Sequence, residues 1–464
     1  MPPPETVEEA AAHKRGTESD LLIVGAGAKA AAISAKIHVV NRLGYGPFSV
    51  TIVEKTEPAA SWLGRNGMTS GEEPLAIPPI KDVGFPYRSR RQFGDVGDEI
   101  DAGLLPFTWQ RYAVERGTYA AWVNRESPPV RHRDYGEYLG WVLERAREGI
   151  AHFHGRVSGV GLAPQGDCWE VEVAERGDPA DPLRHRGRAL ILTGPGVHRE
   201  FPSDPSIADR VFHCDSRRDE FARVPAQEEV EIAIVGGGES ALSALVFLRA
   251  FRPRARLTVF TPTLPLSRGE SFLENRVFAD PDDVGWERLD LQTRRDFVKH
   301  CDRGVFDVGV LASIAGDGQC SFVTGRAVHV GAGEGAGVAL EYEGADGVVA
   351  EPYDFVVNCT GFDLLAQVRG LFDEQLRAAV ERLAGPLWDR PPQTEIPIGR
   401  ALELVGMEPR LHIPGLGGLS QGPGFANLGS LGLLANRVLG PLLGPALGGA
   451  AGSASEQRKS VLID

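Results

Sequence analysis

The sequence has no long hydrophobic run and few cysteines, and both absences exclude classes of protein. No apolar segment reaches the ~18 residues that a membrane-spanning helix needs, and residues 1–18 are acidic, without the apolar core of a signal peptide. The five cysteines are odd in number, scattered and never spaced Cys-x-x-Cys. We therefore predict a reduced, cytoplasmic protein with no metal site, no dithiol chemistry and no integral membrane segment.

The chain also has fewer basic than acidic residues. The chain has 49 lysines and arginines against 63 aspartates and glutamates, a net charge of -14, and no basic stripe runs along it, so we expect neither nucleic acid nor an anionic membrane as a partner. The hydrophobic content of 42% and charged content of 24% are typical of globular proteins. A length of 464 residues indicates about two or three domains.

The strongest pattern present is a dinucleotide-binding fingerprint near the amino terminus. A strand-like run at 21–24 leads into Gly25 and Gly27, and a helical pattern begins at Ala30. Gly25 makes the tight turn, Gly27 lets a pyrophosphate approach the backbone, and Ala30 lets the helix sit close to the sheet. A second strand ends in Glu54, where a carboxylate can bind ribose hydroxyls. The alternative is a βαβ unit that binds no nucleotide.

The same pattern returns about 210 residues later. A strand at 230–235 runs into Gly236 and Gly238, and Glu239 and Ser240 open an apolar helix. Because chance would have to produce strand, glycines and helix twice, the two copies indicate two nucleotide sites and hence two cofactors.

The strand after the second fingerprint indicates which nicotinamide nucleotide binds. The strand at 256–260 is followed by no acidic residue but by Thr261, Thr263, Ser267 and Arg268. Hydroxyls and an arginine tolerate the 2′-phosphate of NADPH, whereas a carboxylate would favour NADH, so the pattern favours NADPH.

Long loops and single polar residues supply further candidates. The loop at 59–89 carries aromatics and Lys81, and loops of this length hold ligands in βαβ folds, although it could simply cover the sheet edge. Asn275 and Asp302 stand among apolar neighbours, where they could equally be helix caps or turn residues. Seven aromatic residues at helical spacing are predicted to pack in the core: Trp109, Tyr112, Tyr119, Trp122, Tyr135, Tyr138 and Trp141.

The predicted fold is α/β, with two Rossmann-like dinucleotide-binding domains and a small, mostly helical substrate region. We expect the strand at 353–362 to return the chain to the first sheet, so that the NADPH domain is inserted into the FAD domain. The predicted parts are a disordered leader at 1–18, the FAD domain at 19–225 and 351–447, the NADPH domain at 226–350, and a mobile tail at 448–464.

Taken together, the motifs resemble a known family. The series Gly-Ala-Gly-Ala-Lys-Ala, Lys-Asp-Val-Gly-Phe-Pro-Tyr-Arg-Ser, Gly-Gly-Gly-Glu-Ser, Arg-Gly-Glu-Ser-Phe-Leu-Glu-Asn, Asp-Arg-Gly-Val-Phe and Gln-Gly-Pro-Gly-Phe is similar to the flavin-dependent N-hydroxylating monooxygenases. It looks most like the L-lysine N6-monooxygenases of mycobactin- and nocobactin-type siderophore pathways, and the likeness covers about residues 20–440.

The resemblance implies roles for individual residues. Lys81 matches the family's lysine that pairs with the substrate carboxylate, and Asn275 matches the asparagine that holds the α-amine. Asp302 stands where ornithine enzymes have a second asparagine, and Asn427 stands near their usual serine beside the flavin. The cofactor-binding residues predicted from motif and resemblance are Gly25, Gly27, Ala30, Glu54, Trp62, Met68, Gly236, Gly238, Glu239, Ser240, Arg268, Thr360, Gly361 and Gly424.

The implied reaction is N-hydroxylation of the side-chain amine of L-lysine through a C4a-hydroperoxyflavin, with NADPH and O2, to supply a hydroxamate precursor for a siderophore. No side chain acts as a catalytic group and no metal is needed. The alternatives are an L-ornithine N5-monooxygenase, another flavin monooxygenase such as a Baeyer-Villiger enzyme, and a non-catalytic flavin-binding redox sensor. A disulfide reductase would need paired cysteines beside the flavin. Whether the chain forms a homo-oligomer is left open.

Overall fold

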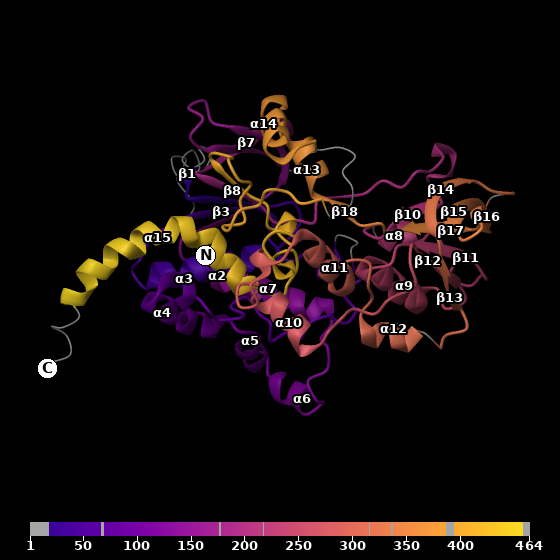
Figure 1. The fold of residues 1–464 in the computed structure, drawn as a ribbon, viewed down its shortest axis with the longest axis horizontal. Helices are drawn as coiled ribbons and strands as arrows, with labels where there is room; N and C mark the ends of the chain where they lie inside the picture. Colours follow the sequence, from indigo (N-terminus) through magenta and orange to yellow (C-terminus); the bar gives the residue numbers. More distant parts are fainter. Residues whose placement is uncertain are drawn as a thin grey trace.

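The chain folds around two five-stranded sheets that lie at different places along the long axis of the molecule (Figure 1). The computed structural model describes residues 18–457, except 66–68, 176–177, 217, 315, 336 and 387–393. In the part of the chain that it describes, no helix has the length and apolar character needed to cross a membrane.

The first sheet is entirely parallel, in the strand order β19-β8-β2-β3-β4. Leu22 and Ile23 in its central strand are fully buried, as expected for a parallel sheet covered on both faces. Helix α2 (Ala28–Arg42) follows that strand directly. The strands are β2 (Leu21–Val24), β3 (Val50–Glu54), β4 (Ile150–His154), β8 (Ala189–Leu192) and β19 (Arg410–His412).

The second sheet repeats the first, again with parallel strands, in the order β10-β17-β11-β12-β13. Ile232, Ala233 and Ile234 in β11 are fully buried, and helix α9 (Glu239–Phe251) follows that strand. The strands are β10 (Val211–His213), β11 (Glu231–Val235), β12 (Arg256–Thr261), β13 (Cys320–Thr324) and β17 (Phe355–Asn358). The predicted class, α/β with two Rossmann-like domains, is confirmed.

The second sheet is inserted into the first, but the chain returns at a different strand from the one predicted. β17 lies between β10 and β11 of the second sheet, so the prediction that the strand at 353–362 rejoins the first sheet is wrong. The return is made by β19, which pairs with β8. A buried parallel strand is a hydrophobic run in either sheet, so the sequence pattern could not assign this strand to one sheet or the other. The predicted domain boundaries remain predictions.

Smaller sheets flank or connect the two large ones. The two linkers between the large sheets pair as an antiparallel ribbon, β9 (Val197–His198) with β18 (Phe362–Asp363). One flanking sheet has the order β1-β7-β6-β5 and the other the order β14-β15-β16. Their strands are β1 (Glu18–Ser19), β5 (Arg156–Leu162), β6 (Trp169–Glu175), β7 (Asp178–Gly187), β14 (Arg326–Ala332), β15 (Val338–Gly344) and β16 (Gly347–Tyr353).

Most helices cover the first sheet or build the region between the two sheets (Figure 1). The predicted aromatic core is confirmed: Trp109, Tyr112, Tyr135 and Tyr138 are buried, and the other three aromatics pack against the same core. The remaining helices are α3 (Arg90–Phe93), α4 (Asp95–Leu104), α5 (Trp109–Glu115), α6 (Tyr119–Val123), α7 (His132–Arg145), α8 (Arg218–Phe221), α10 (Phe272–Ala279), α11 (Leu291–Cys301), α12 (Val308–Ile314), α13 (Leu364–Leu371), α14 (Glu374–Ala384) and α15 (Leu431–Gln457).

A buried lysine of α2 makes hydrogen bonds to helix α15. The ammonium of Lys36 donates hydrogen bonds to Ser89 Oγ (3.1 Å), to the carbonyl of Gly432 (3.0 Å) and to the side chain of Asn436. Lys36 is only 1% exposed, and burial lowers its pKa from 10.5 to about 7. The helix continues to Gln457, beyond the predicted start of the tail. Of the predicted leader at 1–18, residues 1–17 lie outside the described residues, as do residues 458–464.

Candidate functional site

The first glycine turn has the geometry that its fingerprint predicts. Gly25 has φ +99°, and a Cβ there would lie 2.6 Å from Thr193 Oγ1, so only glycine fits. Gly27 is the N-cap of α2, with no side-chain cap and open space where a Cβ would stand. Ala30 is fully buried against the sheet. The free N–H groups of the first turn of α2 therefore face a space that an anion can enter.

Glu54 lies at the end of β3 beside this turn. Its Oε2 accepts a hydrogen bond from the Ala26 N–H (2.9 Å) and its Oε1 accepts one from the Thr56 N–H (2.9 Å). These two bonds fix the carboxylate next to the glycine turn. Because an ionised carboxylate has about four acceptor positions, it retains capacity to bind hydroxyl groups of a ligand.

The second glycine turn repeats the arrangement. Gly236 has φ +145°, and a Cβ there would lie 2.4 Å from the Cys359 carbonyl oxygen. Gly238 is the N-cap of α9 and again carries no side-chain cap. Glu239 and Ser240 form the first turn of that helix, where burial raises the pKa of Glu239 to about 7 although nearby Arg268 lowers it.

Three carboxylates hold Arg268, and one of them, Glu239, lies at the start of α9. Its guanidinium contacts Glu270 (2.7 Å), Glu239 (3.3 Å) and Asp307 (3.4 Å), and it donates to the carbonyl of Ala76 (2.9 Å). This last bond ties the second sheet's region to the long loop that carries Lys81. Arg268 therefore lies beside the second nucleotide turn and is paired with acidic groups, and its contact with the cofactor stays a prediction.

Lys81 and Asn275 meet although 194 positions separate them in sequence. The Lys81 ammonium donates to Asn275 Oδ1 at 3.0 Å. The Asn275 amide in turn donates to the carbonyls of Glu270 (2.8 Å) and Ser271 (3.3 Å), which fixes the orientation of its oxygen. Burial, with a smaller contribution from Arg268, lowers the pKa of Lys81. The two residues form a polar pair at the surface, with Asn275 exposed.

A buried carboxylate positions the loop that presents Lys81. Asp82 is 3% exposed and accepts hydrogen bonds from the Tyr87 hydroxyl (2.7 Å) and from the backbone N–H groups of Gly84 (3.2 Å) and Trp109 (3.1 Å). Burial raises its pKa to about 6. Asp82 thus fastens the turn after Lys81 to the aromatic core, and the sequence analysis gave this residue no role.

Asp302 and Asn427 also meet. Asp302 is the C-cap of α11, and its Oδ1 accepts a hydrogen bond from the Asn427 amide at 3.1 Å, while Arg303 lies 3.1 Å from its other oxygen. Lys29, in the first turn of α2, donates to the carbonyl of Ala426 at 3.5 Å. Burial, with a contribution from Arg303, lowers the pKa of Lys29 to about 8. Lys29 was overlooked, although it lies inside the first fingerprint.

Helix α10 links the two pairs. One turn beyond Asn275, the Phe278 carbonyl would lie only 2.1 Å from a Cβ at Gly424, so this glycine allows α10 to pack on the turn that precedes Asn427. At the end of α10, the buried Asp280 accepts hydrogen bonds from Arg88 (2.7 Å) of the Lys81 loop and from Arg91 (2.9 Å) of α3, which follows that loop.

The remaining predicted residues within the described part of the chain lie in the linker and in the aromatic core. Thr360 donates to Asn358 Oδ1 at 2.7 Å, and Gly361, with φ +99°, accepts from the Arg199 N–H at 2.9 Å; both residues lie in the linker that contains β18. Trp62 packs edge-on against Tyr135 in the aromatic core. Met68 lies outside the described residues.

The structure also brings together residues that sequence spacing keeps apart. Cys214 and Cys359 follow the neighbouring strands β10 and β17, and a hydrogen bond from the Cys359 thiol is the largest cause that lowers the pKa of Cys214 to about 6. Two groups of side chains have donor atoms close enough together to hold a metal ion, while the absence of a metal site stays a prediction. They are His198 with His213 and Asp215, and Glu274 with His300 and Cys301.

The fold and the two glycine turns define a two-dinucleotide oxidoreductase, in which one nucleotide-binding unit is inserted into the other. The chain belongs to the L-lysine 6-monooxygenase/L-ornithine 5-monooxygenase family, whose model matches residues 104–316. It is 36% identical over 433 residues to L-lysine N6-monooxygenase MbtG of Mycolicibacterium paratuberculosis, covering 91% of this chain and 95% of that one.

Solved structures agree with this assignment. Lysine monooxygenase NbtG from Nocardia farcinica is 33% identical, with a TM-score of 0.76 over 91% of this chain and all of that one. Ornithine hydroxylase PvdA from Pseudomonas aeruginosa is 19% identical, with a TM-score of 0.69 over 93% of this chain and all of that one, and shows the fold alone.

Proposed function

We propose that the protein hydroxylates the side-chain amine of L-lysine at N6, with FAD as the bound cofactor and NADPH and O2 as co-substrates, for siderophore biosynthesis. The observation that carries the proposal is the 3.0 Å contact between Lys81 and Asn275, two residues that the family resemblance assigns to the amino acid's head group. The MbtG and NbtG relatives, at 36% and 33% identity, are both lysine monooxygenases, which favours lysine over ornithine.

The first turn fits FAD and the second fits NADPH. Open space at Gly27, together with the uncapped N–H groups of α2, suits a diphosphate, and Glu54 suits a ribose. Gly238 opens α9 in the same way, with Ser240 in its first turn. When bound, FAD accepts hydride from NADPH and activates O2 for transfer of one oxygen atom to the amine.

The Lys81 pair binds the end of the substrate that does not react. The Lys81 ammonium pairs with the substrate carboxylate, and Asn275 Oδ1 accepts a hydrogen bond from the α-ammonium, so the amino acid replaces part of the existing Lys81–Asn275 contact. Hydrogen bonds between charged groups of this kind are worth about 1.5–3 kcal/mol each. Binding at the head group fixes how far the side-chain amine extends.

The Asp302–Asn427 pair is assigned to the reacting amine. The amine of lysine has a solution pKa of about 10.4 and attacks only when neutral. Lys29 lies beside this pair, and Arg303 compensates the charge of Asp302. With Arg303 and Asp302 paired, the charge of Lys29 disfavours another cation close by, so it favours the uncharged amine. The Asn427 amide and the Asp302 carboxylate can then orient it by hydrogen bonds.

Removal of the Lys81 side chain tests the proposal. We expect Lys81→Ala to lose about 10- to 150-fold in kcat/KM for lysine hydroxylation, which corresponds to one charged hydrogen bond, while it still binds FAD and oxidises NADPH. Lys299→Ala, which removes an exposed lysine on α11, is the matched control. Equal hydroxylation by Lys81→Ala and by wild type would contradict the assignment.

Two further aspects belong to the same proposal. As a biosynthetic enzyme whose described residues contain no membrane-spanning helix, the protein is assigned to the cytoplasm. Its partners are the amino acid and O2. Whether the chain forms a homo-oligomer is a separate question, which size-exclusion chromatography with light scattering answers directly.

A further inference from the structure

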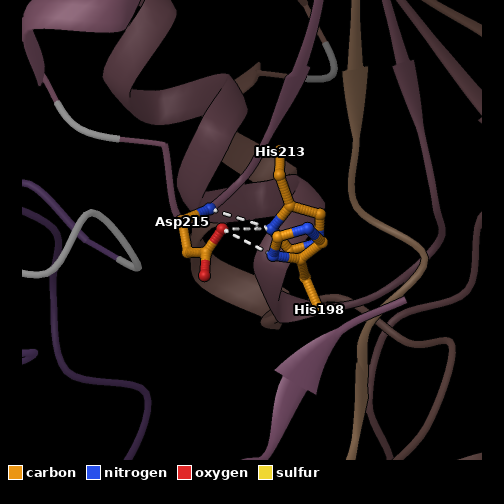
Figure 2. A group of neighbouring side chains, drawn as sticks. All are labelled: His198, His213 and Asp215. Atoms are coloured by element: carbon orange, nitrogen blue, oxygen red, sulfur yellow. Dashed lines mark hydrogen bonds and ion pairs between the residues drawn. The ribbon is translucent and has the colours of Figure 1, made fainter. Parts of the chain in front are cut away.

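Three side chains with metal-ligand chemistry converge where the first linker meets the second sheet. His198 belongs to the linker strand β9, His213 ends β10, and Asp215 follows two residues later. Figure 2 shows the two imidazole rings stacked and both facing the carboxylate. Asp215 Oδ1 lies 2.5 Å from His213 Nδ1 and 3.6 Å from His198 Nδ1, and all three ligand atoms lie within 4.8 Å of one another.

We propose that His198, His213 and Asp215 form a binding site for a divalent transition-metal ion of the zinc class. Two imidazole nitrogens and one carboxylate oxygen are ligands that Zn²⁺ accepts, with the fourth position left to water. Metal–ligand bonds of about 2.0–2.2 Å in a tetrahedron place neighbouring ligand atoms about 3.3 Å apart. The 3.6 Å separation is close to that value.

The shorter contact would have to lengthen on metal binding. His213 Nδ1 lies 2.5 Å from Asp215 Oδ1 and accepts a hydrogen bond from the Asp215 N–H at 3.2 Å. A metal ion at this nitrogen would replace that hydrogen bond and move the two ligand atoms apart by less than ~1 Å. Such a movement needs only a small change in side-chain rotamers.

The exposure of the three side chains gives the site an entry path. The side chain of His213 is 8% exposed, that of Asp215 29% and that of His198 48%, so the site opens to solvent on the His198 side. The ring centroids of the two histidines lie 4.3 Å apart, so no other side chain separates them.

The position of the site gives it a consequence for the enzyme. His198 belongs to the β9–β18 ribbon that connects the two large sheets, whereas His213 belongs to the second sheet. A bound metal would fasten the linker to the second sheet and restrain its reorientation. The relative NbtG is described as having an unprecedented NADPH domain conformation.

Zinc titration of the untagged, FAD-loaded, metal-stripped chain tests the site. We expect one Zn²⁺ to bind per chain by isothermal titration calorimetry, and we expect binding at least tenfold weaker in His198→Ala and in Asp215→Asn. Because His198 is half exposed, its replacement should leave the fold intact, and unchanged thermal unfolding of the metal-free variant checks this. His152→Ala, which removes an exposed histidine on β4, should bind zinc as wild type does.

Two outcomes would overturn the proposal. One is equal zinc affinity in wild type, His198→Ala and Asp215→Asn. The other is that His300→Ala loses zinc binding while His198→Ala binds zinc as wild type does, which would place the site at the group of Glu274, His300 and Cys301. The functional readout rests on the proposed function: Zn²⁺ should slow flavin reduction by NADPH in wild type but not in His198→Ala. Since the calorimetry does not depend on activity, failure of the metal site and failure of the proposed function are distinguishable.

Discussion

Single residues show most clearly what the sequence could and could not predict. Gly25 and Gly236 follow from local backbone demands, because each sits at a positive φ where a Cβ would clash. The Lys81–Asn275 contact joins residues 194 positions apart, and only the family resemblance indicated it. Lys29 and Asp82 lie within quoted motifs, but the motifs do not indicate their roles, because those roles come from burial, which depends on segments far away in sequence.

Lys36 makes the stability of the protein depend on pH in a defined direction. Its pKa is about 7 in the folded chain and ordinary, about 10.5, in the unfolded chain. Between these values the unfolded state binds more protons, so stability should rise with pH from about 7 to 10.5 and lie at its lower level below pH 7. Relative to Lys36→Met, the free energy of unfolding of wild type should rise by up to ~1.4 kcal/mol per pH unit over this range.

Urea unfolding at several pH values measures this difference. Lys299→Met, which changes an exposed lysine, should unfold in parallel with wild type. A constant difference between wild type and Lys36→Met from pH 7 to pH 10 would show that Lys36 does not titrate as its burial requires.

At the scale of elements, the start of α9 combines a nucleotide turn with an acidic residue. Burial raises the pKa of Glu239 to about 7, and a carboxylate here repels the phosphates of NADPH when ionised. We expect the KM for NADPH to increase as pH rises through 7 in wild type and to stay nearly flat in Glu239→Gln, whose amide also leaves Arg268 freer to meet the cofactor. Steady-state kinetics from pH 6 to 9 measure both.

The control for Glu239→Gln is Glu287→Gln, because the Glu287 side chain is 67% exposed. Its KM for NADPH should vary with pH as that of wild type does. A profile of Glu239→Gln that is as steep as that of wild type would remove Glu239 from the nucleotide site.

The attachment of α10 to the Lys81 loop is the second prediction at this scale. Asp280 is 4% exposed and binds Arg88 and Arg91, both of which are partly exposed. We expect Asp280→Ala to lower the free energy of unfolding by about 1–3 kcal/mol and to raise the KM for lysine, since Asn275 would lose its fixed position. Chemical denaturation and substrate kinetics measure these effects.

Asp95→Ala provides the comparison, because the Asp95 side chain is 90% exposed and pairs with the exposed Arg90. This substitution should change neither the free energy of unfolding nor the KM for lysine measurably. A stable Asp280→Ala protein with an unchanged KM would show that the loop and α10 hold their positions independently.

For the whole molecule, the two fingerprints predicted two nucleotide units, and the sheets confirm them. The prediction placed β17 in the wrong sheet, because the sequence of a hydrophobic strand does not indicate which strands pair with it. The convergence of His198, His213 and Asp215 was likewise invisible, since it arises where a linker folds back on a sheet. Local turns were therefore predictable, whereas contacts made by long-range packing were not.

The central claim is that one chain holds two nucleotides and directs oxygen to the amine of lysine. The most direct measurement is product formation by the FAD-loaded protein with NADPH and O2, with L-lysine and L-ornithine compared side by side by mass spectrometry. We predict N6-hydroxylysine, with kcat/KM for lysine at least tenfold above that for ornithine. NADPH oxidation that yields no hydroxylated lysine, or a preference for ornithine, would contradict the account.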